Sequence, residues 1–313
     1  MIRVPLCAVV ALIATLVPFS AGAAVKSDER VLVVLATAGT EPYSVGDVER
    51  TAAQATAFLK ASSFGQVHLR VDVTPWLSAF TATPGCGGST SGSLGTVAGP
   101  ARAAADKAGY DASRYDDVVY AIADSHCGYF GATVGKEVLL TRQPTLDLLL
   151  HELGHAFGLG HAQSSPCVLD SLRCATDDTG DPFSPMGHGS LDYSAYEKSL
   201  LGWLPAQPRV LRAGRYVLAP PATRTQLAQA LVVETEGGTW WIEYRAKPFR
   251  GLVFRFVDPT QHPYPFAPSA VLIEDPARKH RAWIRQGESY RLPFSFRVTL
   301  VRAGATRAEV RFR

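Results

Sequence analysis

The sequence has little net charge and few sulfur-containing residues. Its 31 lysines and arginines nearly balance 28 aspartates and glutamates, so the net charge is only +3, and it holds five cysteines and two methionines. The charged residues are well mixed, without a basic run or an alternation of basic and aromatic residues. Proteins that bind nucleic acid through such patches are therefore excluded. The sequence also has no internal repeat.

A long apolar run is missing as well. The apolar stretch Leu6–Val17 is shorter than the ~20 residues that a membrane-spanning helix needs. Arg3 precedes this stretch, and Ala21–Ala23 offers the small residues of a cleavage site, which is typical of a secretory signal peptide. We expect a signal peptide at residues 1–24, no membrane span, and a secreted or periplasmic protein.

Few cysteines remain once the signal peptide is removed. An even number of cysteines in an exported chain favours disulfide bonds, here two of them. Three pairings exist for the remaining cysteines, which are Cys86, Cys127, Cys167 and Cys174. We expect Cys167 to pair with Cys174, closing a short loop, and Cys86 to pair with Cys127. A second metal site at these cysteines is the alternative.

The most informative segment is His-Glu-Leu-Gly-His-Ala-Phe-Gly-Leu-Gly-His, which runs from His151 to His161. On a helix, His151 and His155 project from one face, one turn apart. This spacing suits two neighbouring ligands of a tetrahedral zinc ion. Glycines after the second histidine let the helix end and the chain turn back, which would bring His161 to the same ion. Three protein ligands and one open position are typical of a catalytic zinc.

Glu152 lies beside the first histidine of this segment. We expect it to take a proton from a water that the metal activates, and not to bind the metal itself. The alternative is a surface helix with chance histidines, but the glycine and the third histidine at fixed offsets argue against it. Asp177, Asp178 and Asp181 could bind Ca²⁺, although their spacing matches no EF-hand loop. Carboxylates that stabilise turns are the other interpretation of these three residues.

Hydrophobic periodicity predicts an α+β fold before residue 208. A buried strand at 31–36, an amphipathic helix at 45–62 and a strand at 66–73 give a β-α-β order, which suggests a sheet with helices packed on it. Further expected elements are a loop at 83–99, a helix at 100–109, a strand at 117–123, an edge strand within 127–140, a helix that begins at Thr145 as its N-cap, and a helix at 193–203.

The pattern changes to short alternating strands after Pro205 and Pro208. Such a pattern predicts a β-sandwich of roughly a hundred residues, with a hairpin turn at Glu236-Gly237-Gly238. The expected strands are 215–218, 231–236, 240–245, 252–257, 270–274, 282–285, 296–301 and 309–312.

The long form of the histidine motif, H-E-x-x-H-x-x-G-x-x-H, is the signature of the metzincin metalloproteases, which also carry a methionine turn beneath the zinc. Met186 is the only methionine besides the first residue, and it follows Asp181 in a Pro- and Gly-containing segment. With Leu201-Gly202-Trp203 and Trp241–Arg245, the chain resembles the gametolysin-like branch of this family over most of its mature length.

The resemblance implies a metzincin-type catalytic domain at residues 25–207, followed by a small β-sandwich at 208–313. It implies a secreted, monomeric endopeptidase that uses one zinc ion, with Glu152 as general base and Met186 as a packed floor under the metal. The substrate would be a polypeptide, an extracellular protein or glycoprotein, that pairs with the edge strand within 127–140.

The sequence departs from the family pattern at two points. No inhibitory propeptide with a zinc-blocking cysteine is visible, although Cys86 in Pro84-Gly85-Cys86-Gly87 is superficially similar to one. A tyrosine follows the methionine by two residues in some metzincins, whereas His188 stands there in this chain. His188 is either a solvated loop residue or a hydrogen-bond donor to the tetrahedral oxyanion.

Two other functions compete with the endopeptidase. One is a degenerate zinc-binding protein whose β-sandwich recognises carbohydrate or protein. The other is a zinc hydrolase that acts on something other than peptides. The intact Glu152 argues against the binding protein, because a binding module has no use for a base beside the metal.

Overall fold

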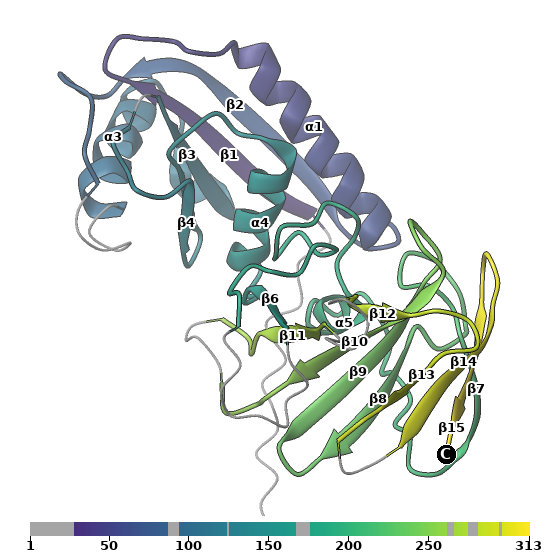
Figure 1. Ribbon diagram of the computed structural model, residues 1–313. Coiled ribbons are helices and arrows are strands. Elements are labelled where there is room, and N and C mark those ends of the chain that lie inside the picture. Colours follow the sequence, from purple (N-terminus) through teal and green to yellow (C-terminus); the bar gives the residue numbers. More distant parts are fainter. Residues whose placement is uncertain are drawn as a thin grey trace, which may run out of the picture.

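The structure, a computed structural model, contains helices and several sheets, as expected for an α+β protein (Figure 1). It describes residues 28–86, 94–123, 125–166, 176–261, 266–274, 281–293 and 296–313. The expected signal peptide and the expected Cys167–Cys174 disulfide lie outside the described residues. No helix in the described part of the chain is both long enough and apolar enough to cross a membrane.

The elements of the first part alternate between strands and helices. They are β1 (Asp28–Thr37), α1 (Val45–Ser62), β2 (His68–Ser78), a π-helix (Leu94–Ala98), α3 (Gly99–Lys107), a 3-10 helix (Ala112–Arg114), β3 (Asp117–Ile122), β4 (Gly131–Val134), β5 (Glu137–Leu140), α4 (Leu146–Ala156), β6 (Ala162–Ser165) and α5 (Ala195–Leu200).

Strands dominate the second part. They are β7 (Gly214–Leu218), β8 (Ala230–Thr235), β9 (Gly238–Arg245), β10 (Gly251–Val257), β11 (Ala270–Ile273), β12 (Trp283–Ile284), β13 (Ser289–Arg291), β14 (Arg297–Ala303) and β15 (Ala308–Phe312).

The first sheet has the strand order β2-β1-β3-β5-β4, and helices cover both of its faces. Side chains alternate along a strand, so Val33 and Leu35 of β1 pack with α1 and α4, whereas Leu32 and Val34 pack with α3 and the π-helix. All neighbouring strands run parallel except β4, which runs antiparallel to β5 at the edge of the sheet. The sheet thus presents β4 beside α4.

Local signals fix α1. Ser44 is its N-cap and forms a capping box with Asp47, in which each side chain accepts a hydrogen bond from the backbone of the other residue. Its inward face carries Val48, Ala55 and Leu59. The predicted bounds of 45–62 are confirmed.

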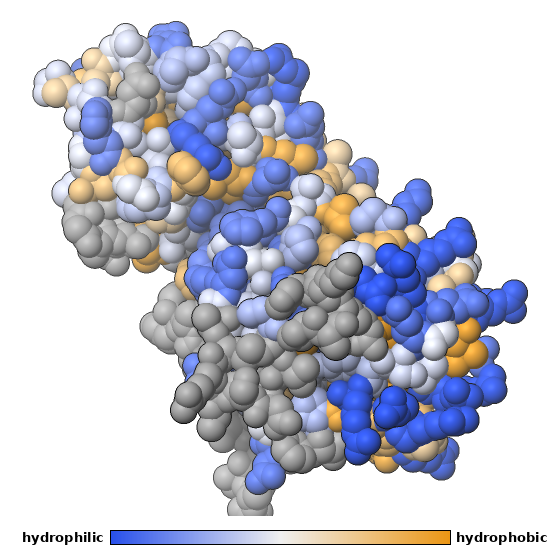
Figure 2. Space-filling model, in the orientation of Figure 1, coloured by the Kyte–Doolittle hydropathy of each residue, from blue (hydrophilic) through white to orange (hydrophobic). Residues whose placement is uncertain are grey.

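Two further sheets form the second part of the chain. One has the order β6-β11-β10-β9-β8, with β12 also paired to β10, and the other has the order β13-β14-β15-β7. A shared apolar core, which includes Trp240 and Phe254 from the first and Leu300 and Phe312 from the second, lies between them. The hairpin predicted at Glu236-Gly237-Gly238 is confirmed between β8 and β9. The outer surface of these sheets is mainly hydrophilic on the face shown in Figure 2.

The structure corrects three expectations for these elements. The predicted loop at 83–99 is wrong at its end, where residues 94–98 form the π-helix and α3 begins at Gly99. The helix expected at 193–203 is shorter, since α5 ends at Leu200. The strands β6 and β13 were not predicted, and β6 pairs in parallel with β11, so a strand from before residue 208 belongs to a sheet of the second part.

The predicted Cys86–Cys127 disulfide is present, with 5.1 Å between the Cα atoms, within the usual range for a disulfide. Cys86 follows β2, and Cys127 precedes β4. The bond therefore links the segment after β2, at one edge of the first sheet, to the segment before β4, at the other edge.

Candidate metal centre

The helix α4 presents its histidines from one side and its leucines from the other. Thr145 is its N-cap, and its side chain accepts a hydrogen bond from the backbone N–H of Leu148, as predicted. Leu149, Leu150 and Leu153 are buried against the first sheet and α1. Burial of these leucines fixes the rotation of the helix, and so the direction of the opposite face.

Three histidines converge beside this helix. The metal-binding nitrogens of His151, His155 and His161 all lie within 4.8 Å of one another. Gly158 has a φ of +94°, a conformation that favours glycine, and there the chain turns back after the helix. This turn carries His161 to the two helical histidines. In the part of the chain that the structure describes, no other group of three histidines, cysteines or acidic residues could hold an ion.

In each histidine, Nδ1 is engaged in a hydrogen bond, which leaves Nε2 as the nitrogen that can bind a metal. Nδ1 of His151 lies 2.9 Å from the carbonyl oxygen of Pro185, and Nδ1 of His155 lies 2.8 Å from that of Leu159. A carbonyl oxygen only accepts, so these Nδ1 atoms carry the protons and the Nε2 atoms are free to bind a metal.

The third histidine has a carboxylate partner. Nδ1 of His161 lies 2.5 Å from Oδ2 of Asp178, whose Oδ1 accepts a hydrogen bond from the side chain of Gln163. A carboxylate behind a histidine ligand orients the ring and strengthens its bond to a metal. Asp178 therefore supports the centre as the hydrogen-bond partner of His161.

Burial keeps the helical histidines uncharged. It lowers the pKa of His151 to about 4 and that of His155 to about 3. Both rings are therefore neutral at pH 7, the form in which imidazole binds a metal. A metal ion that binds here therefore has no proton to displace from Nε2 of either ring.

Glu152 is buried beside the histidines and points toward β4. Its side chain is only 4% exposed, and Oε2 accepts a hydrogen bond of 2.7 Å from the hydroxyl of Thr133. Burial raises the pKa of the carboxyl to about 7, which the Thr133 hydrogen bond partly opposes. A Cβ atom at Gly131 would overlap the Glu152 carboxyl, so the edge strand needs glycine there.

Met186 forms a floor under α4. It is fully buried, and a Cβ atom at Gly154 would overlap its sulfur. The hydroxyl of Tyr193 donates a hydrogen bond of 2.9 Å to the carbonyl oxygen of Leu150 from the same side. The glycine inside the histidine motif thus allows the methionine to lie directly against the helix.

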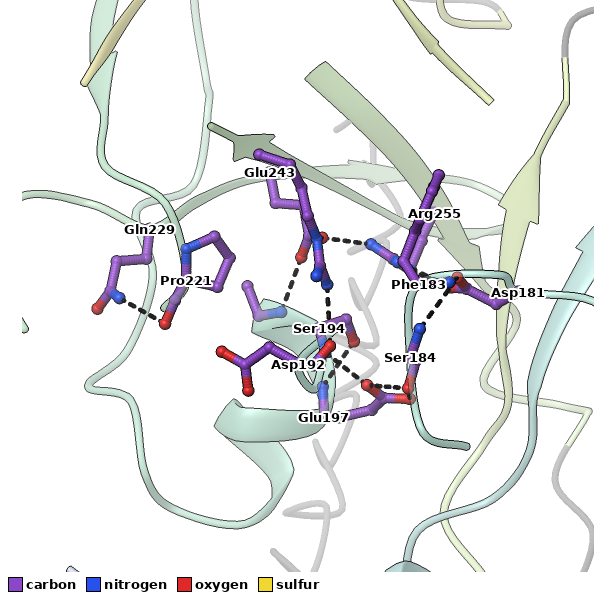
Figure 3. Close-up of polar contacts among 12 residues, drawn as sticks. Asp181, Phe183, Ser184, Asp192, Ser194, Glu197, Pro221, Gln229, Glu243 and Arg255 are labelled. Atoms are coloured by element: carbon purple, nitrogen blue, oxygen red, sulfur yellow. Dashed lines mark hydrogen bonds and ion pairs between the residues drawn. The ribbon is translucent and has the colours of Figure 1, made fainter. Parts of the chain in front are cut away.

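Buried charges hold the loop that carries Met186. Oδ1 of Asp181 accepts a hydrogen bond of 2.8 Å from the backbone N–H of Phe183, and Oδ2 forms an ion pair of 2.8 Å with Arg255 of β10 (Figure 3). The hydroxyl of Ser184 donates to Glu197 of α5, which also caps that helix. The loop is thus bound both to α5 and to the second part of the chain.

Glu243 extends this group of buried charges. It forms ion pairs of 2.7 Å with both Arg245 and Arg255, and it accepts a hydrogen bond from the backbone N–H of Ala195. Burial opposes ionisation of Glu243, but the two guanidinium groups outweigh it and lower its pKa to about 2. Burial raises the pKa of the nearby Glu197.

Comparisons with known proteins add little to this geometry. No protein-family model matches the chain, and no curated protein matches it. Among solved structures, the chain is similar to one described as "Structure of a chaperone-substrate complex", with 15% sequence identity and a TM-score of 0.34. The similarity covers 55% of this chain and spans 29% of that chain. It is too weak to support a conclusion about fold or function.

A cleft of about 820 Å³ opens over the three histidines. Gly131, Ala132 and Thr133 of β4 line one side, together with Glu152. The opposite side comes from the end of β10, the start of β11 and the segment before β11. The ring of Phe266 in that segment lies 4.7 Å from the ring of His155, centroid to centroid. Both parts of the chain therefore enclose the candidate metal centre.

The other residues proposed from the sequence, His188 and three aspartates, have different surroundings in the structure. His188 is exposed, lies 3.3 Å from the hydroxyl of Thr179 through its Nε2, and is not among the described residues that line the cleft. Asp177 accepts a hydrogen bond from the backbone N–H of Thr179, as a carboxylate that stabilises a turn does. Asp178 contacts His161, and Asp181 contacts Arg255, so the three aspartates serve three separate purposes.

Proposed function

We propose that this protein is a zinc-dependent endopeptidase of the metzincin type, similar to gametolysin, and that it acts outside the cytoplasm. The observation that carries the proposal is the convergence of His151, His155 and His161 with each Nδ1 already bonded. The buried Glu152 and the Met186 floor add the other two features that the family resemblance requires. The Cys86–Cys127 disulfide suits an oxidising compartment.

The donor set favours zinc. Three imidazole nitrogens and one open position are typical of catalytic zinc sites. Calcium and magnesium prefer oxygen ligands, and the nearby aspartates are bonded to His161 and to Arg255. We therefore propose one zinc ion, held by His151, His155 and His161.

Zinc bound there would polarise the scissile carbonyl and lower the pKa of a water molecule, which would make hydroxide available as the nucleophile at neutral pH. Glu152 accepts the proton of that water and passes it to the amine that leaves. The hydroxyl of Thr133 holds the carboxylate in place through its 2.7 Å hydrogen bond. The raised pKa of Glu152 suits a group that must both take and return a proton near pH 7.

A polypeptide is the substrate that the cleft fits best. The edge strand β4 lines the cleft and, among the described strands, pairs only with β5. Its free side can add an extended peptide strand by backbone hydrogen bonds. Such a strand would place a peptide bond beside Glu152 and the three histidines. This geometry favours peptide hydrolysis over the other zinc hydrolase chemistry.

The purified protein, loaded with zinc, tests the proposal on a library of peptides prepared from whole-proteome digests. We expect cleavage that a chelator abolishes and that added zinc restores. The Glu152→Ala variant should keep one zinc per chain and lose about 10²–10⁴-fold in rate. One bound zinc without any cleavage would refute the endopeptidase and favour a zinc-binding recognition protein instead. Wild-type activity in the Glu152→Ala variant would refute the assigned role.

A further inference from the structure

The wall of the cleft opposite β4 is a face of the β10–β11 pair. Phe256 of β10 pairs with Val271 of β11, and both line the cleft. Side chains two positions apart share one face of a strand. Asp258 and Ser269 lie two positions beyond this pair and also line the cleft. These four residues are called the β10–β11 face below.

The β10–β11 face is apolar along the strands and polar at its end. Phe256 and Val271 are half-buried, so their side chains are only partly covered by the protein. Asp258 is also half-buried, and its Oδ1 accepts hydrogen bonds from the backbone N–H and the hydroxyl of Thr260, at 2.8 and 2.7 Å. This turn holds the carboxylate at the end of the apolar surface.

Ser269 provides an independent sign of a ligand. Its side chain is 8% exposed, and its hydroxyl has no hydrogen-bond partner among the described residues. A buried hydroxyl without a partner is costly, and native proteins leave few of them. Ser269 lines the cleft, so a rotation of its shielded hydroxyl toward the cleft would let a bound ligand supply the missing partner.

The charge of the cleft indicates the kind of ligand. Its described lining residues include the carboxylates of Glu152, Asp178 and Asp258 and no lysine or arginine. Glu152 is bonded to Thr133, and Asp178 to His161. Asp258 accepts its hydrogen bonds through Oδ1 from Thr260 of its own turn, and no cation lines the cleft beside it. Its carboxylate is therefore placed to pair with a cationic group, and a long aliphatic stem would cover the apolar residues beside it.

We propose that the β10–β11 face is a subsite for a lysine or arginine side chain of the polypeptide substrate. The methylene groups pack on Phe256 and Val271, and the cationic head pairs with Asp258 and donates a hydrogen bond to Ser269. The inference rests on the proposed function, which places a polypeptide in the cleft. It makes the C-terminal sheet a determinant of substrate choice.

Binding to the zinc-loaded Glu152→Gln variant tests the subsite without cleavage. The probes are peptides in which one lysine moves along a neutral sequence, each with a counterpart that carries norleucine, which has the stem without the charge. At one position, we expect lysine to bind about tenfold more tightly than norleucine, as a charge-assisted hydrogen bond allows. The preference should weaken as salt is added.

Asp258→Asn in the same background should abolish the lysine preference. Asparagine retains an oxygen that can accept the bonds from Thr260, so the turn is kept while the charge is lost. Ser269→Ala should reduce the preference in part. Glu236→Gln is the matched control, because Glu236 is exposed in the hairpin turn between β8 and β9 and is not among the described residues that line the cleft, so it should leave the preference intact.

The outcomes separate the subsite from the proposed function. A lysine preference at no position, or one that survives Asp258→Asn, would overturn the subsite even if the wild-type protein cleaves peptides. A preference that Asp258→Asn removes would support the subsite even if the wild-type protein cleaves nothing. In that second case, the endopeptidase proposal fails alone.

Discussion

Replacing Arg255 with methionine removes a cation from a deeply buried group of charged side chains. Arg255 is 1% exposed and forms ion pairs with Asp181 and Glu243, which are 0% and 2% exposed. Methionine has a similar length and fills much of the same space, so the main change is the loss of charge. Two carboxylates then lose a buried partner.

The cost can be worked out from Glu243. Its pKa falls from 4.5 to about 2 because Arg245 and Arg255 outweigh its burial, and this net shift corresponds to about 3 kcal/mol. Asp181 loses its ion pair in addition. Removing one partner of a buried pair usually costs about 3–5 kcal/mol, so we expect the free energy of unfolding at pH 7 to fall by about that amount.

The pH dependence gives a second check on Arg255→Met. A carboxyl whose pKa is lowered in the folded state adds stability above its unfolded pKa and loses that contribution as the pH falls. The difference between wild type and variant should therefore shrink between about pH 5 and pH 2. Metal affinity should also weaken, because Asp181 supports the loop whose Pro185 carbonyl binds His151.

Urea unfolding of the metal-free proteins measures the change in stability and its pH dependence, and competition with a chelator measures the change in metal affinity. Arg215→Met is the matched control, because Arg215 pairs with Glu309 on the surface of the same part of the chain and is 63% exposed. An exposed pair contributes at most about 1 kcal/mol. The reasoning is refuted if Arg255→Met costs no more than Arg215→Met, or if its cost does not change between pH 7 and pH 2.

Three further predictions concern the metal centre. Glu152→Gln should stabilise the metal-free protein by about 3 kcal/mol near pH 8 and hardly at all near pH 4, since burial raises the pKa of Glu152 from 4.5 to about 7 and stability falls as pH rises through that window. Urea unfolding that shows the same gain at both pH values would contradict this. Asp178→Asn should weaken metal binding about 10–100-fold in competition with a chelator, and an unchanged affinity would show that Asp178 does not orient His161. Gly131→Ala should slow peptide hydrolysis about a hundredfold by displacing the Glu152 carboxyl, at unchanged metal content. Gly128→Ala, whose added Cβ meets no atom within 4 Å, is its control, and an equal loss in both would refute the overlap.

Local signals made much of the fold predictable from the sequence. The helices α1 and α4 each carry their own signals in their local sequence, namely the N-caps Ser44 and Thr145 and a stripe of apolar residues. The short strand β6 is different, because its sequence Ala-Gln-Ser-Ser shows no apolar alternation. It is a strand because β11 pairs with it, and such tertiary pairing overrides local propensity.

The candidate site also contains residues that the sequence reveals and residues that only the structure reveals. Its three histidines and Glu152 fall within one motif, so their spacing reveals them. The partners that orient them do not, since Thr133 and Asp178 lie 19 and 17 positions from the residues they contact. No periodic pattern relates such positions, and only the folded chain brings them together.

The position of β6 has a consequence for the order in which the protein matures. His161 leads directly into β6, and the strand that pairs with it, β11, is synthesised later, after β7, β8, β9 and β10. During synthesis, the first sheet and α4 emerge early, with two of the three imidazoles in place. The pairing that anchors the third can form only after β11 has also left the ribosome, so a nascent chain that stops before β11 lacks the strand that holds β6 in place.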